Sequence, residues 1–285
     1  MIIVIHGSSR NAPDHYRYIA RAANLVGATD TLIVAPQFMT LDDVVKAGLS
    51  DDALYWSDGG WKEGDPSESA PLTRAGSISS FAVIDQFIAQ VSDRSVFPNL
   101  ADIVVVGHSA GGQFVHRYAA ETRIEQTLAS AGNRYRYVVA NPSSYLYFDD
   151  TRYQADAFAP LTVAQRQACS QVNNYKYGLE RLNGYGDAVG AAAIRAQYES
   201  RNVVFLLGAD DTNPTDSSLD TSCGAQWQGP QRLARGTTFF AYLGHHFGSS
   251  IYQDQVARVV PNIGHDARDM YASADGTWAL FGPLR

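Results

Sequence analysis

The 285-residue chain lacks several features that would assign it to a particular class of protein. No apolar run approaches the roughly 18 residues that a membrane-spanning helix needs, so the sequence predicts no transmembrane segment. The net charge is −7, and lysine and arginine do not cluster, which argues against a nucleic-acid partner. Internal repeats and low-complexity tracts are also lacking. The length suits one large α/β domain or two small ones.

Cysteine is equally scarce, because only Cys169 and Cys223 occur. Both lie in polar, loop-like surroundings, whereas unpaired structural thiols usually lie in apolar strands. We therefore expect a disulfide, which would close a loop of about 54 residues and indicate a secreted or periplasmic protein. The alternative is a cytoplasmic protein with two unpaired thiols.

A signal peptide is also lacking, since Met1 leads directly into four apolar residues, 2–5, that are typical of a buried strand. Either the natural protein begins here, or an export signal and some leading structure have been removed. The sequence leaves both readings open.

Strands and helices alternate along the chain, which predicts an α/β fold with a mostly parallel central sheet and helices on both faces. Two segments, 41–73 and 142–200, break the alternation, and we interpret the longer one as an insertion over the active-site edge of a single domain spanning 1–285. The expected strands are 2–5, 31–35, 103–106, 135–140, 203–207 and 258–260, and the expected helices are 14–25, 79–91, 111–131, 231–247 and 266–273.

The most informative motif is the pentapeptide Gly107-His108-Ser109-Ala110-Gly111. A run of β-branched residues precedes it and a helical segment follows, which places the serine at a sharp turn between strand and helix. Both glycines are needed there, because a side chain at either position would collide with the neighbouring strand or helix. The context favours a nucleophilic hydroxyl on Ser109 over an ordinary turn.

A serine hydroxyl needs a base to accept its proton and an acid to orient that base. On this kind of sheet the acid and then the base follow the serine along the chain. Asp210 and Asp211 both come just after the strand expected at 203–207 and compete for the first role. His265, in the loop after the last expected strand, is the candidate base.

The negative charge that develops on the substrate oxygen needs two backbone N–H donors. Ala110, next to the serine, should supply one, and Ser8, in the loop His6-Gly7-Ser8-Ser9, should supply the other. The remaining histidines do not stand at a spacing that would complete a set of metal ligands, so we expect neither a metal nor a cofactor.

Together these residues resemble those of the α/β-hydrolase superfamily. His6-Gly7, the pentapeptide around Ser109, Asp211 and His265 occur in the superfamily's order, and the resemblance spans essentially the whole chain. A Gly-x-x-Asp spacing after the strand is the commoner arrangement in the superfamily, and it favours Asp211 over Asp210.

A narrower similarity links the chain to secreted microbial serine esterases of the polyester-depolymerase and feruloyl-esterase type. It rests on Trp61, Gly64, the segment 141–145 and the cysteine-bearing insertion. The chain departs from such hydrolases in having no strand before that at 2–5, whereas most have one or two. It also carries His-Gly-Ser-Ser instead of His-Gly-Gly-Gly, which argues against cleavage of bulky tertiary-alcohol esters.

The resemblance implies a serine carboxylic-ester hydrolase (EC 3.1.1 type) that acts through an acyl-enzyme on a small-molecule or polymeric ester. A peptidase or amidase would use the same groups, and a binding module with an inactive site is a third alternative. Arg10 could bind a substrate carboxylate or be an ordinary surface arginine. The expected pocket residues are Arg10, Trp56, Trp61, Tyr145, Tyr147 and Phe148.

Overall fold

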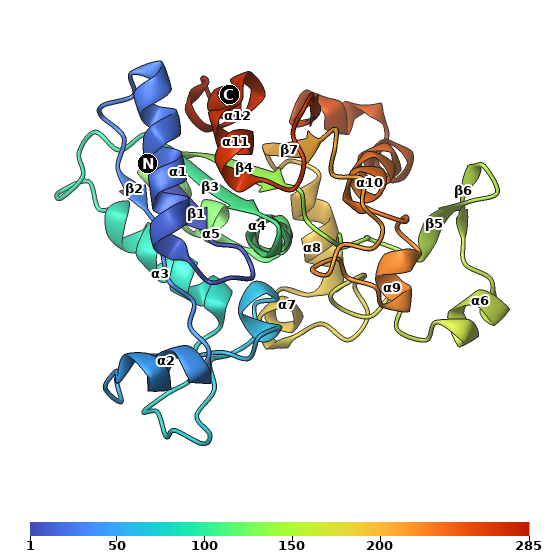
Figure 1. Ribbon diagram of the computed structural model, residues 1–285, viewed down its shortest axis with the longest axis horizontal. Coiled ribbons are helices and arrows are strands. Elements are labelled where there is room, and N and C mark those ends of the chain that lie inside the picture. The colour runs from blue at the N-terminus through green and yellow to red at the C-terminus, as the bar shows by residue number, and fades with distance from the viewer. Residues whose placement is uncertain (285) are drawn as a thin grey trace.

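The computed structural model describes residues 1–284 and shows a parallel sheet of six strands with helices on both faces (Figure 1). The strand order is β2-β1-β3-β4-β7-β8, and every neighbouring pair is parallel. The strands are β1 (Ile2–Ile5), β2 (Ile33–Val34), β3 (Asp102–His108), β4 (Arg134–Ala140), β7 (Val203–Gly208) and β8 (Gln255–Val260).

Alternate residues of each strand point to opposite faces of the sheet and build two apolar layers. In β1, for example, Ile2 and Val4 belong to one layer, and Ile3 and Ile5 belong to the other. The first layer is covered by α1 (Ala12–Val26), α11 (Ala267–Ala272) and α12 (Ala274–Phe281). The second is covered by α3 (Ser80–Val91), α4 (Ala110–Glu121), α8 (Ala191–Tyr198) and α10 (Arg232–Phe247).

The six expected strands are confirmed, although β2 is shorter than predicted and β8 begins three residues earlier. The single helix expected over 111–131 is wrong. Helix α4 ends at Glu121, Thr122 is extended, and α5 (Ile124–Thr127) and the 3-10 helix η2 (Ala129–Ala131) follow. The Thr122 hydroxyl accepts a hydrogen bond from the Ile124 N–H, so this side chain competes with the helical pattern at the break.

The two segments that break the alternation contain short elements that the sequence did not reveal. The first holds α2 (Leu41–Ala47) and η1 (Gly60–Lys62). Between β4 and β7 lie an antiparallel hairpin of β5 (Thr151–Gln154) and β6 (Ala157–Pro160), α6 (Val163–Ala168), α7 (Gly184–Val189) and α8. The hairpin and α6 project from one side of the molecule (Figure 1). The remaining short elements are α9 (Cys223–Gln226) and η3 (Ser249–Gln253).

The expected disulfide is present and joins Cys169, at the end of α6, to Cys223, the first residue of α9. It therefore fastens the segment between β4 and β7 to the loop that follows β7. Among residues 1–284 we find no helix both long and apolar enough to cross a membrane.

Candidate active site

Ser109 occupies a strained turn between β3 and α4, with φ 58° and ψ −117°. A Cβ atom on Gly107 would lie 2.2 Å from the carbonyl oxygen of Gly111, and one on Gly111 would lie 2.3 Å from the carbonyl oxygen of Ile5. These contacts confirm that both glycines are needed for the turn. The close approach of strand and helix presents Ser109 at the carboxyl end of the sheet, where α/β folds bind their ligands.

His265 and Asp211 meet Ser109 at this edge. The Nε2 atom of His265 lies 2.9 Å from the Ser109 Oγ, and Nδ1 lies 2.7 Å from the Asp211 Oδ2. Asp211 is buried, whereas the neighbouring Asp210 is exposed. The geometry therefore favours Asp211 over Asp210 as the partner of the imidazole.

Two further side chains hold this arrangement from outside. Asn141, after β4, donates from Nδ2 to the carbonyl of Gly264 (3.1 Å) and accepts from the N–H of Gly208 (2.8 Å), which ties the His265 loop to β7. The ring of His108 lies 4.6 Å from that of His265, between centroids. Burial, followed by the nearby His265, lowers the pKa of His108 well below its usual value, so this ring is neutral.

The loop that carries Ser8 is held by two buried histidines. His6 donates from Nδ1 to the Gly7 carbonyl (2.9 Å), and His15 accepts from the Gly7 N–H through Nε2 (3.1 Å). Burial lowers the pKa of each ring to about 4. Neutral imidazoles are required, because a protonated His15 could not accept that bond. No local sequence pattern indicated the contact between Gly7 and His15, because it depends on how α1 packs over the loop.

Ala110 is the first residue of α4, so its N–H belongs to the helical amides that have no acceptor inside the helix. Such amides, at the positive end of the helix dipole, suit an anionic oxygen.

A cavity of about 350 Å³ opens beside Ser109 and His265. Hydroxyl, amide and charged side chains dominate its lining, and none of its lining residues comes from the segment 142–200. They include Ser8, Ser9, Asn11, His15, Tyr18, Ser218, Asp266 and Arg268.

The aromatic residues expected in the pocket lie elsewhere. These residues are only 0 to 4% exposed. Their side chains belong to the second apolar layer, on the face of the sheet that α4 and α10 cover. We therefore correct the prediction that they contact substrate. The residues concerned are Trp56, Trp61, Tyr145, Tyr147 and Phe148.

Arg10 pairs with the carboxylates of Asp43 (2.6 Å) and Asp58 (3.0 Å). Its charge is already compensated, so the structure favours the surface role over capture of a substrate carboxylate.

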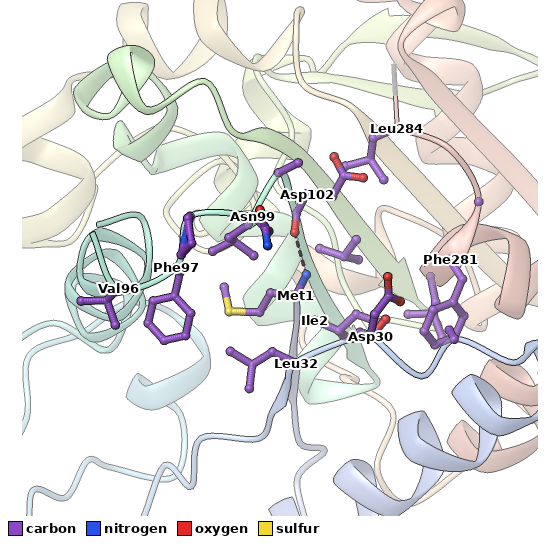
Figure 2. Close-up of a pocket in the computed structure, with 18 residues that line it drawn as sticks. Met1, Ile2, Asp30, Leu32, Val96, Phe97, Asn99, Asp102, Phe281 and Leu284 are labelled. Carbon is purple, nitrogen blue, oxygen red and sulfur yellow. Dashed lines mark hydrogen bonds between the residues drawn. The ribbon is translucent and has the colours of Figure 1, made fainter. Parts of the chain in front are cut away.

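A larger cavity, of about 640 Å³, lies at the amino ends of the strands, whereas Ser109 lies at their carboxyl ends (Figure 2). Met1 and Asp102, at the amino ends of β1 and β3, line it, and the terminal amino group of Met1 donates to the Asp102 carbonyl at 2.7 Å. This cavity is separate from the Ser109 site. In the described part of the chain, no group of three or more His, Cys, Asp or Glu side chains is arranged to hold a metal ion.

Comparison with known proteins supports the fold through structure alone. No protein-family model and no curated protein matches the chain. The poly(3-hydroxybutyrate) depolymerase LpqC from Bordetella parapertussis is similar with a TM-score of 0.62 and 20% identity, over 100% of this chain and 79% of that one. Poly(aspartic acid) hydrolase-1 from Sphingomonas sp. KT-1 is similar with a TM-score of 0.61 and 24% identity, over 94% and 83%. With the parallel sheet and the turn at Ser109, this similarity shows that the chain has the α/β-hydrolase fold.

Proposed function

We propose that the protein is a serine hydrolase that cleaves carboxylic esters through an acyl-enzyme intermediate. The observation that carries the proposal is the continuous chain of contacts from the Ser109 Oγ through the His265 ring to the buried Asp211 carboxylate. Nucleophile, base and orienting acid within hydrogen-bond reach of one another are the signature of nucleophilic acyl transfer.

In the first half-reaction, His265 takes the proton of Ser109 as the serine oxygen attacks the carbonyl carbon. Asp211 holds the imidazole tautomer and stabilises its positive charge. The N–H groups of Ala110 and Ser8 hold the oxyanion. When the tetrahedral intermediate collapses, the C–O bond to the alcohol breaks, and His265 gives its proton to the leaving alkoxide. In the second half-reaction, His265 takes a proton from water, the hydroxide attacks the acyl carbon, and the acid leaves as Ser109 regains its proton.

The polar lining of the cavity supports substrates with short, hydrogen-bonding groups over long alkyl chains. Ligand pockets are usually lined mainly by apolar side chains, which this cavity has few of. The two similar structures are named for hydrolysis of a polyester and of poly(aspartic acid). We therefore include small esters and polyesters of hydroxy acids in the substrate class, with amide-linked polymers as the second candidate because amide cleavage uses the same groups.

The disulfide supports a secreted or periplasmic location, since such bonds persist in oxidising compartments. We also propose that residues 1–285 form one α/β-hydrolase domain with an insertion at about 142–200, because strands on both sides of that segment belong to one sheet.

A panel of p-nitrophenyl esters, from acetate to octanoate, assayed beside amino-acid p-nitroanilides tests the reaction class. We expect turnover of the short esters and a loss of about 1,000-fold or more in kcat/KM for Ser109→Ala. Ser95→Ala, at an exposed serine whose hydroxyl donates to the Asp93 carboxylate and does not line the cavity, is the control and should retain activity. Turnover confined to the anilides would favour the amidase, and undiminished activity of Ser109→Ala would refute the mechanism.

A further inference from the structure

A buried arginine stands behind the candidate acid. The side chain of Arg232, the first residue of α10, is 1% exposed, and its Nη1 atom lies 3.4 Å from the Asp211 Oδ1. Its Nη2 atom lies 2.9 Å from the Asp216 Oδ1 and donates to the Ser218 Oγ at 2.8 Å. The carboxylate that contacts His265 on one side therefore contacts a guanidinium on the other.

The backbone fixes this arginine in place. The N–H of Leu233 donates to the carbonyl of Asp211 (3.2 Å), and the Gln231 side chain caps α10 by accepting from the N–H of Ala234 (2.8 Å). Ser218, which the guanidinium also holds, lines the cavity beside Ser109. Arg232 thus joins the candidate acid to the loop at the rim of the site.

We propose that Arg232 is a positioning residue for the Asp211 carboxylate, and that Arg232 and Asp216 together set how readily His265 takes up a proton. The proposal rests on the proposed function of Ser109, Asp211 and His265. A buried charge must be paired, and the planar guanidinium carries N–H donors on both terminal nitrogens, so Arg232 can hold Asp211 through Nη1 and Asp216 through Nη2 at once.

The charges of Arg232 and Asp216 act on the protonation of His265 in opposite directions. Arg232 is positive and faces Asp211, so it reduces the negative potential at His265 and opposes protonation of the ring. Asp216 is negative and compensates part of that effect. Removing the arginine charge should therefore favour the protonated ring, and removing the Asp216 charge should disfavour it.

Other groups that face His265 come from several elements. His108 is the last residue of β3, and His15 lies in α1. Burial lowers the pKa of both rings, so both are neutral near pH 7. Asp266 and Arg268, at and near the start of α11, line the same cavity and carry opposite charges. The charge of Arg232 also lowers the pKa of His108, but burial is the larger cause, so this ring should stay neutral when the arginine charge is removed.

The direct test is NMR titration of the His265 imidazole in the intact 285-residue chain, with the resonance assigned by means of a His265→Gln variant. Arg232→Met keeps most of the buried volume and removes the charge, and we expect the titration midpoint to rise by about one pH unit. Asp216→Asn should lower it by about half a unit, since Asp216 contacts Arg232 and not the imidazole, and its side chain is 29% exposed. Ser218→Ala removes a hydrogen bond to Arg232 without changing any charge and should leave the midpoint in place.

The acid side of the pH profile of kcat/KM for p-nitrophenyl acetate should move in the same two directions. Arg232→Lys keeps the charge and should restore the wild-type midpoint more closely than Arg232→Met, even where its kcat is low. Midpoints that stay fixed, or that move in the same direction for Arg232→Met and Asp216→Asn, would overturn the proposal. The NMR titration needs no turnover, so it tests Arg232 even if ester hydrolysis fails, whereas loss of ester hydrolysis alone refutes only the proposed function.

Discussion

Glu121, the last residue of α4, gives the stability of the protein a specific dependence on pH. The residue is fully buried, and within residues 1–284 no donor makes a well-formed hydrogen bond to either of its carboxyl oxygens, although the Tyr175 hydroxyl is near. Burial raises its pKa to about 8, although Tyr175 and Arg117 act in the opposite direction. The carboxyl group also lies near the negative end of the α4 dipole, which disfavours its charged form.

The sign and size of the effect follow from linkage. In the unfolded chain the carboxyl group titrates near 4.5, so between pH 4.5 and about 8 the folded protein keeps a proton that the unfolded chain has released. Stability should therefore be greatest below pH 4.5 as far as this group is concerned, and should fall by about 1.4 kcal/mol per pH unit up to the folded pKa. The total loss is about 5 kcal/mol, with no further change above that pH.

Urea unfolding of the wild type and Glu121→Gln at pH 5, 6, 7, 8 and 9 measures this contribution. We expect the free energy of unfolding of the variant to gain on the wild type steadily up to about pH 8, because the amide carries no proton to lose. Glu199→Gln, at an exposed glutamate, is the matched control and should run parallel to the wild type. If the curves for Glu121→Gln and the wild type are also parallel between pH 5 and 8, the carboxyl group is not buried in its neutral form and the reasoning fails.

Two further predictions concern the site itself. Gly111→Ala should lower the free energy of unfolding by about 1 to 3 kcal/mol, since its Cβ would lie 2.3 Å from the Ile5 carbonyl oxygen, whereas Gly76→Ala meets nothing within 4 Å and should be nearly neutral in chemical denaturation. Asp211→Asn should lower kcat by about 1,000-fold or more while Asp210→Asn stays close to the wild type in the same assay. Equal losses at 210 and 211 would contradict the assignment.

The sheet could be predicted because its strands are short apolar runs separated by helical segments. The ends were missed where strands carry polar residues: Arg134 and Gln255 begin β4 and β8, yet both lie in the hydrogen-bonded ladder. The hairpin of β5 and β6 was missed because its turn uses Ala155 and Asp156 at positive φ, without the glycine that usually marks such turns.

The nucleophile, base and acid could be proposed because their chain order and the turn around Ser109 constrain them. The pocket residues could not be predicted, because the local sequence around a loop aromatic does not distinguish a side chain that lines a cavity from one that, like Trp61, packs in the core. Arg232 and His15 were missed because their contacts depend on where α10 and α1 pack relative to the loops at Asp211 and Gly7, and no local sequence pattern indicates that placement.

The central claim is that the Ser109 hydroxyl is made nucleophilic by the contact with His265. Labelling of the intact protein with a fluorophosphonate, followed by peptide mass spectrometry, tests it most directly. We expect one adduct, on Ser109, formed at a rate that falls by about 1,000-fold or more in His265→Ala. An unlabelled Ser109, or labelling that is equally fast without the imidazole, would contradict the account.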